Sequence, residues 1–214
     1  MPALPTPMQQ GSDDSREQPI VSHTVWVAVA VGLLVGFARG GRLANVAEAG
    51  VRWPLLAIGA LAVQSVAMAA LDGPAAVWLV VASLAGLAAF AVRNLALPGF
   101  WPLLAGVAMN LLVIGLNGGM PVSAAALEAA GRQDILAEAR GNPNAKHHLI
   151  ERGDVLTPLS DVIPVPRLAG EVMSPGDVLV DLGIAWVLAG AMRRRREAAA
   201  GTGTERSEAR PGAG

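Results

Sequence analysis

The sequence predicts an all-α membrane protein with about five transmembrane helices and a small extracytoplasmic cap loop between the fourth and fifth helices. Two observations predict this class. Hydrophobic residues make up 53% of the 214-residue chain and charged residues only 15%, whereas soluble domains carry about 25% charged residues. The hydrophobic residues also gather in runs close to the roughly 20 residues that a helix needs to cross a bilayer core of about 30 Å.

Five apolar segments have about this length. The predicted spans are 20–38, 53–71, 75–92, 99–116 and 175–192. Asp72-Gly73-Pro74 predicts a tight turn, so the second and third spans form an antiparallel helical hairpin. Pro102 lies near the first turn of the fourth span, where its missing N–H matters least. Ser174-Pro175-Gly176-Asp177 begins the fifth span as a capping box, in which Ser174 and Asp177 each accept the other's backbone N–H.

The remaining segments are more polar. Residues 1–19 have little apolar surface and predict a disordered tail. Residues 117–174 contain no run long enough to span and form the cap loop, in which 124–139 has the spacing of a short amphipathic helix. Later prolines exclude a long helix from the rest of this loop. Residues 193–214 predict a basic and then flexible cytoplasmic tail.

The arginines predict the orientation in the membrane. Arg39, Arg42 and Arg52 lie in the first loop, and Arg93 lies in the third. A run of four arginines, 193–196, follows the last span. In a five-span chain all of these arginines fall on the same side of the membrane. Short basic loops stay in the cytoplasm, whereas long loops translocate largely regardless of charge. The prediction is a multi-pass protein of the cell membrane with the N-terminus outside and the C-terminus in the cytoplasm.

Polar residues around the fourth and fifth spans indicate a candidate site. Asn110 and Asn117 are seven residues apart, close to two helical turns, so they share a face. Gly118 and Gly119 then allow a sharp turn, and the cap loop must return to the same surface to enter the fifth span. We therefore expect Asp161 and the adjacent histidines to lie above Asn117. The candidate binding residues are Asn110, Asn117, His147, His148, Asp161, Asp177 and Asp181.

Each of these residues also has a purely structural interpretation. Helix capping explains Ser174 and Asp177 and is the favoured interpretation of that pair. Interhelical hydrogen bonds explain Asn110 and likewise Gln64 and Asn94. Asp181 lies one turn deeper in an apolar span, so it must face the bundle. Its expected partners are Arg167, Lys146 or the amides within the membrane, and the functional and structural interpretations of it stay open.

Metals, cofactors and nucleic acid have little support in the sequence. The chain has no cysteine and a net charge of −1, which excludes thiolate ligands and gives no general attraction to nucleic acid. His147 and His148 are adjacent, so they cannot point the same way on a helix or strand. A zinc site needs three or four ligands in a defined geometry. The sequence predicts no metal and no cofactor, and the lipid bilayer is the expected surroundings.

A set of short motifs resembles one known family. In order they are 41–45 (GRLAN), Asn94 with 97–99 (LPG), 117–123 (NGGMPVS), 146–149 (KHHL), 159–164 (LSDVIP) and 174–179 (SPGDVL). Over about 25–192 the chain is similar to a bacterial family of small integral membrane proteins catalogued only as a domain of unknown function. That family usually has Leu-Gly-Asp where this chain has Ser160 before Asp161, so this turn differs. The resemblance implies a fold and a place in the cell envelope, and it implies no activity.

Two functions follow as hypotheses. The first is a non-enzymatic envelope protein that binds a protein partner or lipid through its outer cap. The alternative is a membrane enzyme or small-molecule carrier with a polar pocket at the outer ends of the fourth and fifth helices. An enzyme or carrier should lose function with Asp161→Asn or Asp181→Asn while staying folded, whereas an adaptor should respond to packing changes such as Gly118→Leu.

Overall fold

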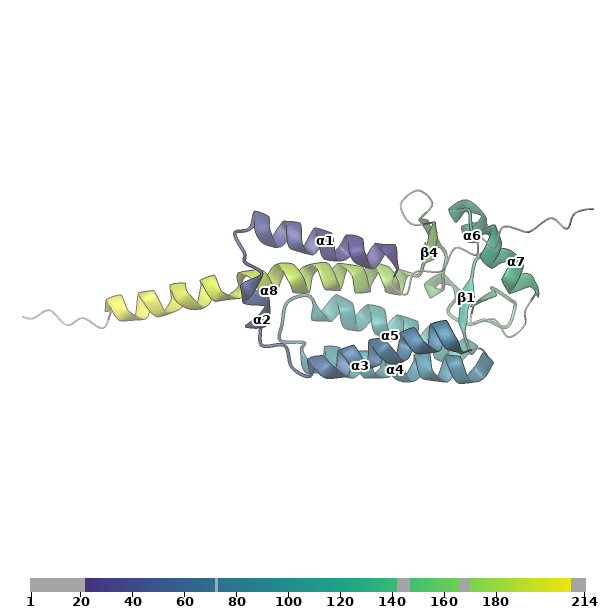
Figure 1. Ribbon diagram of the computed structural model, residues 1–214, viewed down its shortest axis with the longest axis horizontal. Helices are drawn as coiled ribbons and strands as arrows, with labels where there is room; N and C mark the ends of the chain where they lie inside the picture. Colours follow the sequence, from purple (N-terminus) through teal and green to yellow (C-terminus); the bar gives the residue numbers. More distant parts are fainter. Residues whose placement is uncertain (1–21, 72, 142–146, 166–169, 209–214) are drawn as a thin grey trace, which may run out of the picture.

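A computed structural model describes residues 22–71, 73–141, 147–165 and 170–208. Long helices form a bundle with a small cap at one end, and the last helix extends beyond the other end (Figure 1). The helices are α1 (His23–Ala38), α2 (Ala44–Ala47), α3 (Pro54–Ala70), α4 (Gly73–Arg93), α5 (Phe100–Asn117), α6 (Ala124–Ala130), α7 (Gln133–Gly141) and α8 (Pro175–Glu208). The strands are β1 (Met120–Val122), β2 (His147–Leu149), β3 (Ile163–Val165) and β4 (Glu171–Met173), and η1 (Thr157–Leu159) is a 3₁₀ turn.

Three of the helices are long and apolar enough to cross a membrane. They are α4, α5 and the first part of α8, Pro175–Arg193. The apolar helices α1 and α3 are shorter, at 16 and 17 residues. Large apolar side chains on the outside of the bundle are exposed, with Leu55 79% and Trp78 67% accessible. An apolar exterior of this kind suits hydrocarbon rather than water as the surrounding solvent.

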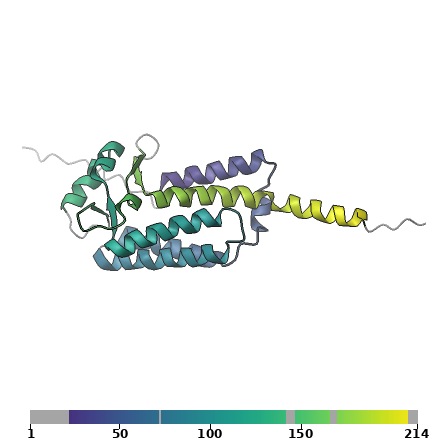
Figure 2. The same cartoon turned by 180° about the vertical axis from the view of Figure 1, so that it is seen from behind.

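The bundle is held together by neighbouring helix pairs. α1 packs on α8, α8 on α5, α5 on α4 and α4 on α3, and Figure 2 shows α1 beside α8 from the opposite side. Glycines allow two of these approaches: a Cβ on Gly32 of α1 would lie 2.7 Å from the Ala185 carbonyl oxygen, and one on Gly183 of α8 would lie 2.7 Å from the Leu103 nitrogen. Small residues bring membrane helices close in this way.

The cap is built on two small sheets. β1 pairs in parallel with β2, and β3 pairs antiparallel with β4. Asp161, just before β3, adds a bridge to Val122 of β1, so the segment that leads into the second sheet is joined to the first. Val122, Leu127 and Leu136 form the buried core of the cap.

Two sequence predictions differ from the structure. The single amphipathic helix over 124–139 is wrong, because Gly131 adopts a left-handed conformation with φ of 77° and ends α6 before α7 begins. Only glycine takes up this conformation without steric cost. The last helix continues past the predicted end at Met192 to Glu208.

Several predicted features lie outside the described residues. They are the N-terminal tail 1–19, Asp72 of the predicted turn, the candidate partners Lys146 and Arg167, and the end of the C-terminal tail, 209–214.

Candidate functional site

Three polar side chains join α5 to the start of α8. Asn110 Nδ2 donates to Asp177 Oδ1 at 2.7 Å, and Ser174 Oγ lies 2.9 Å from Asn110 Oδ1. The predicted capping box is confirmed: the Ser174 N–H donates to Asp177 Oδ2 at 2.9 Å, and the Asp177 N–H donates to Ser174 Oγ at 3.0 Å. Ser174 is fully buried and Asn110 is buried. The cap of α8 is therefore also the polar contact between two helices.

Glycines make room for this contact. A Cβ on Gly176 would collide with Asn110 Oδ1, and a Cβ on Gly106 would collide with the Gly176 carbonyl oxygen. Gly106 and Asn110 are one turn apart on α5, so they share the face that meets α8. The absence of side chains at Gly106 and Gly176 lets Asn110 reach the first turn of α8.

Asp161 approaches the same place from the cap. Its N–H donates to the Pro121 carbonyl at 3.1 Å, and its carbonyl accepts the Ser123 N–H at 2.9 Å. The turn after α5 and the Asp161 region therefore meet, as expected. Asp161 is only 7% exposed. Burial, together with the nearby Asp177 carboxylate, raises the pKa of Asp161 well above its ordinary value.

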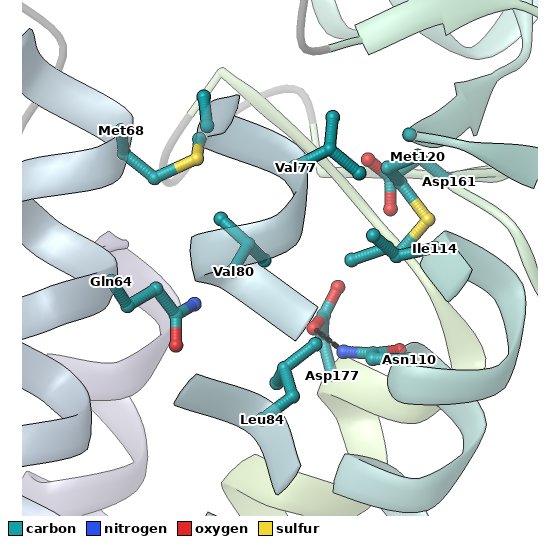
Figure 3. A pocket seen from close by; sticks show the side chains of 12 residues that line it. Gln64, Met68, Val77, Val80, Leu84, Asn110, Ile114, Met120, Asp161 and Asp177 are labelled. Carbon is teal, nitrogen blue, oxygen red and sulfur yellow. Dashed lines mark hydrogen bonds between the residues drawn. The ribbon is translucent and has the colours of Figure 1, made fainter. Parts of the chain in front are cut away.

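Asp161 and Asp177 both face a cavity of about 160 Å³ beneath the cap. In Figure 3 the two carboxyl groups and Asn110 lie to one side, and Gln64 and Met68 of α3 lie across the cavity from them. The walls between are mostly apolar. The lining residues are Gln64, Met68, Ala76, Val77, Val80, Leu84, Asn110, Ile114, Gly119, Met120, Asp161 and Asp177.

Asn117 is not part of the cavity lining. Its Nδ2 donates to the Val155 carbonyl at 3.0 Å, and its Oδ1 accepts the Val155 N–H at 2.9 Å. The same Nδ2 also donates to the Val113 carbonyl at 2.9 Å. Asn117 thus fixes the loop before η1 to the end of α5, and its contacts are structural.

His148 is not among the residues that line the cavity. His148 Nε2 lies 3.0 Å from Asp154 Oδ1, and the Asp154 Oδ2 accepts the Glu151 N–H at 2.8 Å. Burial acts to raise the pKa of Asp154, but these two hydrogen bonds outweigh it and lower the pKa. His147 pairs through its backbone with Met120, and its side chain lies outside the described part of the structure. Within the described ranges, no three His, Asp or Glu side chains gather as metal ligands would.

Asp181 lies between α8 and α1 rather than at the cavity. It is half-buried, and the Thr24 side chain near the start of α1 interacts with it. The sequence did not suggest this threonine, and two of the partners that it did suggest, Lys146 and Arg167, lie outside the described residues.

The two other amides singled out in the sequence, Gln64 and Asn94, make different contacts. Gln64 lines the cavity and accepts a hydrogen bond from Ser83 Oγ at 3.3 Å. Asn94 instead binds both the N–H and the carbonyl of Arg52, at 2.7 and 2.8 Å. Asn110 and Gln64 therefore converge on one cavity, and Asn94 fixes a loop.

Sequence reasoning missed one further polar cluster. Glu171 of β4 binds the Ser22 hydroxyl, the His23 N–H at 2.9 Å and the His23 Nδ1 at 2.8 Å. Burial acts to raise the pKa of Glu171, but the hydrogen bonds from Ser22 and His23 outweigh it and lower the pKa. The cluster ties the start of α1 to the cap. Glu171 is 149 positions from Ser22 and 148 positions from His23 in the chain, so no local sequence pattern predicts this cluster.

Comparison with known proteins places the chain in a family. Residues 48–189 match the model of DUF5317, a family of unknown function, and the chain belongs to this family. The match includes every residue that lines the cavity and leaves out α1. No curated protein and no solved structure matches the chain.

Proposed function

We propose that this chain is a five-span protein of the cell membrane that binds a small molecule in the cavity beneath its outer cap. The N-terminus lies outside and the C-terminus in the cytoplasm. One observation carries the binding proposal: two carboxyl groups and two amides face a cavity with mostly apolar walls, at the end of the bundle where the cap sits. Binding sites for small molecules are commonly apolar cavities with a few convergent polar groups.

The five-span arrangement is supported by the length of α3 and by the residues at its start. At 1.5 Å per residue, the 17 residues of α3 cover about 26 Å, slightly less than a bilayer core of about 30 Å. Trp53 precedes α3, and the Arg93 guanidinium lies 5.6 Å from the centre of its ring. Tryptophan and arginine are typical of the membrane interface. These residues support a membrane surface at the start of α3 and the end of α4.

The depth of the cavity fits a site entered from the outer side. Asp177 is the third residue of α8, and Asn110 lies two turns before the end of α5. Gln64 lies six residues before the end of α3, about 9 Å from it along the axis. The polar groups are therefore close to the cap, and the apolar wall continues from them toward the middle of the bilayer.

This proposal follows the alternative that the sequence left open, a polar pocket for a small molecule at the outer ends of the fourth and fifth spans, and departs from the favoured hypothesis of a protein partner or lipid bound through the outer cap. A membrane enzyme is the second candidate, because Asp161 and Asp177 share one cavity in unlike surroundings. Asp161 is buried beside Asp177, while Asp177 accepts several hydrogen bonds. Pairs of carboxyl groups in unlike surroundings serve as acid and base in enzymes. Recovery of a chemically altered form of the bound molecule would favour this second candidate.

The test is recovery of the bound molecule. The full chain is extracted from native membranes into lipid nanodiscs, and small molecules released from it are identified by mass spectrometry. Val77→Phe adds volume at a half-buried lining position, and Leu79→Phe makes the same kind of change at an exposed position of the same helix. We expect a molecule that is present with the wild type and with Leu79→Phe and depleted with Val77→Phe. The same molecules at the same occupancy in all three would refute binding in the cavity.

A further inference from the structure

The polar side of the cavity is acidic. It carries the carboxyl groups of Asp161 and Asp177, and no lysine, arginine or histidine is among its described lining residues. The one amide beside them, Asn110, already donates to Asp177 and meets Ser174. A phosphate or carboxylate ligand would meet two acids and no basic side chain among the lining residues that the structure describes, so this lining disfavours anions.

Resting on the binding function proposed above, we propose that the cavity takes the ammonium group of a small aliphatic amine. The ammonium lies between Asp161 and Asp177, and the hydrocarbon part packs against Met68, Val80 and Leu84. An ammonium group has three N–H donors, enough to reach both carboxyl groups and still meet one further acceptor.

Asp177 is held in place before a ligand arrives. Asn110 Nδ2 binds its Oδ1 at 2.7 Å, and the Ser174 N–H and hydroxyl bind its Oδ2 at 2.9 and 2.8 Å. A carboxylate oxygen has two lone-pair sites, so Oδ1 keeps the capacity to accept one more donor. A group fixed in this way loses little conformational entropy on binding.

A cation also removes an unfavourable interaction within the cavity. Asp161 is buried, and its charged form is disfavoured by desolvation and by Asp177. A positive charge between the two residues favours ionisation of Asp161. Binding of the ammonium is therefore accompanied by release of a proton from Asp161 wherever that carboxyl group was protonated beforehand. Among the described residues of the helices, Asp177 is a charged group that acts on Asp161.

The apolar wall distinguishes an amine from a metal cation. Calcium takes six to eight oxygen ligands and magnesium about six, but Met68, Val77, Val80 and Leu84 supply none.

The volume of the cavity limits the size of the amine. A cavity of about 150 Å³ can hold benzene, so about 160 Å³ accommodates an ammonium with a short alkyl chain.

The experiment compares three probes that share one alkyl chain and differ in charge. Hexylammonium, hexan-1-ol and hexanoate are titrated by calorimetry into the full chain in nanodiscs of uncharged lipid, and matched empty nanodiscs provide the blank. We expect hexylammonium to bind about tenfold or more tightly than hexan-1-ol, because charge-assisted hydrogen bonds are the stronger ones. We expect no binding of hexanoate.

Three variants connect that selectivity to the cavity. Asp161→Asn keeps the shape of the side chain and should reduce the preference for hexylammonium over hexan-1-ol. Asp134→Asn alters an exposed acid of α7 and should leave the preference unchanged. Val77→Phe should weaken the binding of both hexylammonium and hexan-1-ol if these probes occupy the cavity.

The outcomes separate the two proposals. Equal binding of hexylammonium and hexan-1-ol, lost in Val77→Phe, would overturn the ammonium site and leave a small-molecule cavity. Preference for hexanoate would likewise overturn the assignment of the ligand. If none of the three probes bound to the wild type, the ammonium site would be overturned. The molecules recovered from native membranes would then show whether the cavity binds a small molecule at all.

Discussion

Asn110 of α5 donates a 2.7 Å hydrogen bond to the carboxylate of Asp177 in the first turn of α8. The two residues are 67 positions apart, and the whole cap lies between them in the chain. The bond joins the helix that enters the cap to the helix that leaves it. It also places one carboxyl group and one amide at the polar side of the cavity.

Asn110→Leu removes this connection while keeping the side chain close to its original size. Asp177 Oδ1 then loses its donor, and Ser174 Oγ loses a partner. We expect the free energy of unfolding to fall by about 1–3 kcal/mol, the cost of leaving buried polar groups without partners. Unfolding in mixed detergent micelles measures it. Leu112→Ala, at an exposed position of the same helix, is the control and should change stability far less.

Gly176→Ala tests the close approach of α5 and α8. The added Cβ collides with Asn110 Oδ1, so either the amide or the helix must shift. We expect a loss of about 1–3 kcal/mol in unfolding free energy, typical of overpacking. Gly59→Ala in α3 provides a matched control, because a Cβ there meets nothing within 4 Å. That variant should be neutral or gain up to about 1 kcal/mol from helix propensity. Equal effects of the two substitutions would contradict the packing described here.

The raised pKa of Asp161 predicts a dependence of stability on pH. The folded chain keeps this proton to a higher pH than the unfolded chain, in which Asp has its ordinary pKa of about 3.8. The contribution of Asp161 to stability is therefore fully present below pH 3.8 and is lost as the pH rises through the raised folded-state value. Asp161→Asn removes this titration.

The measurement is the difference in unfolding free energy between wild type and Asp161→Asn across a pH series. We expect the variant to gain stability relative to the wild type as the pH rises from about 4 toward neutrality. A difference that stays constant with pH would show that Asp161 does not have a raised pKa.

The arginine distribution predicts the topology of the whole chain. A reporter fused after Met192 should behave as cytoplasmic, and one inserted near Asn142 should behave as extracytoplasmic. The reason is that the short basic loops all fall on the predicted inner side. Paired alkaline phosphatase and fluorescent protein fusions measure this. The reverse pattern at both positions would refute the proposed orientation and number of spans.

Local rules explain what the sequence predicts well. The capping box at Ser174 and Asp177 depends on residues three positions apart, and its hydrogen bonds are those expected. The meeting of Asp161 with the turn after α5 follows from chain connectivity, because the cap must return to its starting surface. Both inferences need only neighbouring residues and the length of the loop.

Contacts between distant residues explain what the sequence does not predict. Asn117 has the same residue type and the same helix face as Asn110, yet it fixes Val155 while Asn110 lines the cavity. Three-residue strands such as β2 are too short for a recognisable alternation of polar and apolar residues. The convergence of Gln64 with Asn110 requires α3 and α5 to be placed in space, and no local pattern supplies that placement.

Cysteine accessibility tests the central claim, a cavity that a small molecule can reach, most directly. The chain has no cysteine of its own, so Val77→Cys in the cavity and Leu79→Cys on the outside of the same helix each introduce a single thiol. A cysteine reacts as its thiolate, and the thiolate forms only where water reaches the side chain. With aminoethyl methanethiosulfonate added from outside, we predict that Val77→Cys is labelled and that Leu79→Cys, facing lipid, is not. If Val77→Cys were as unreactive as Leu79→Cys in folded protein, the cavity would not be an accessible site.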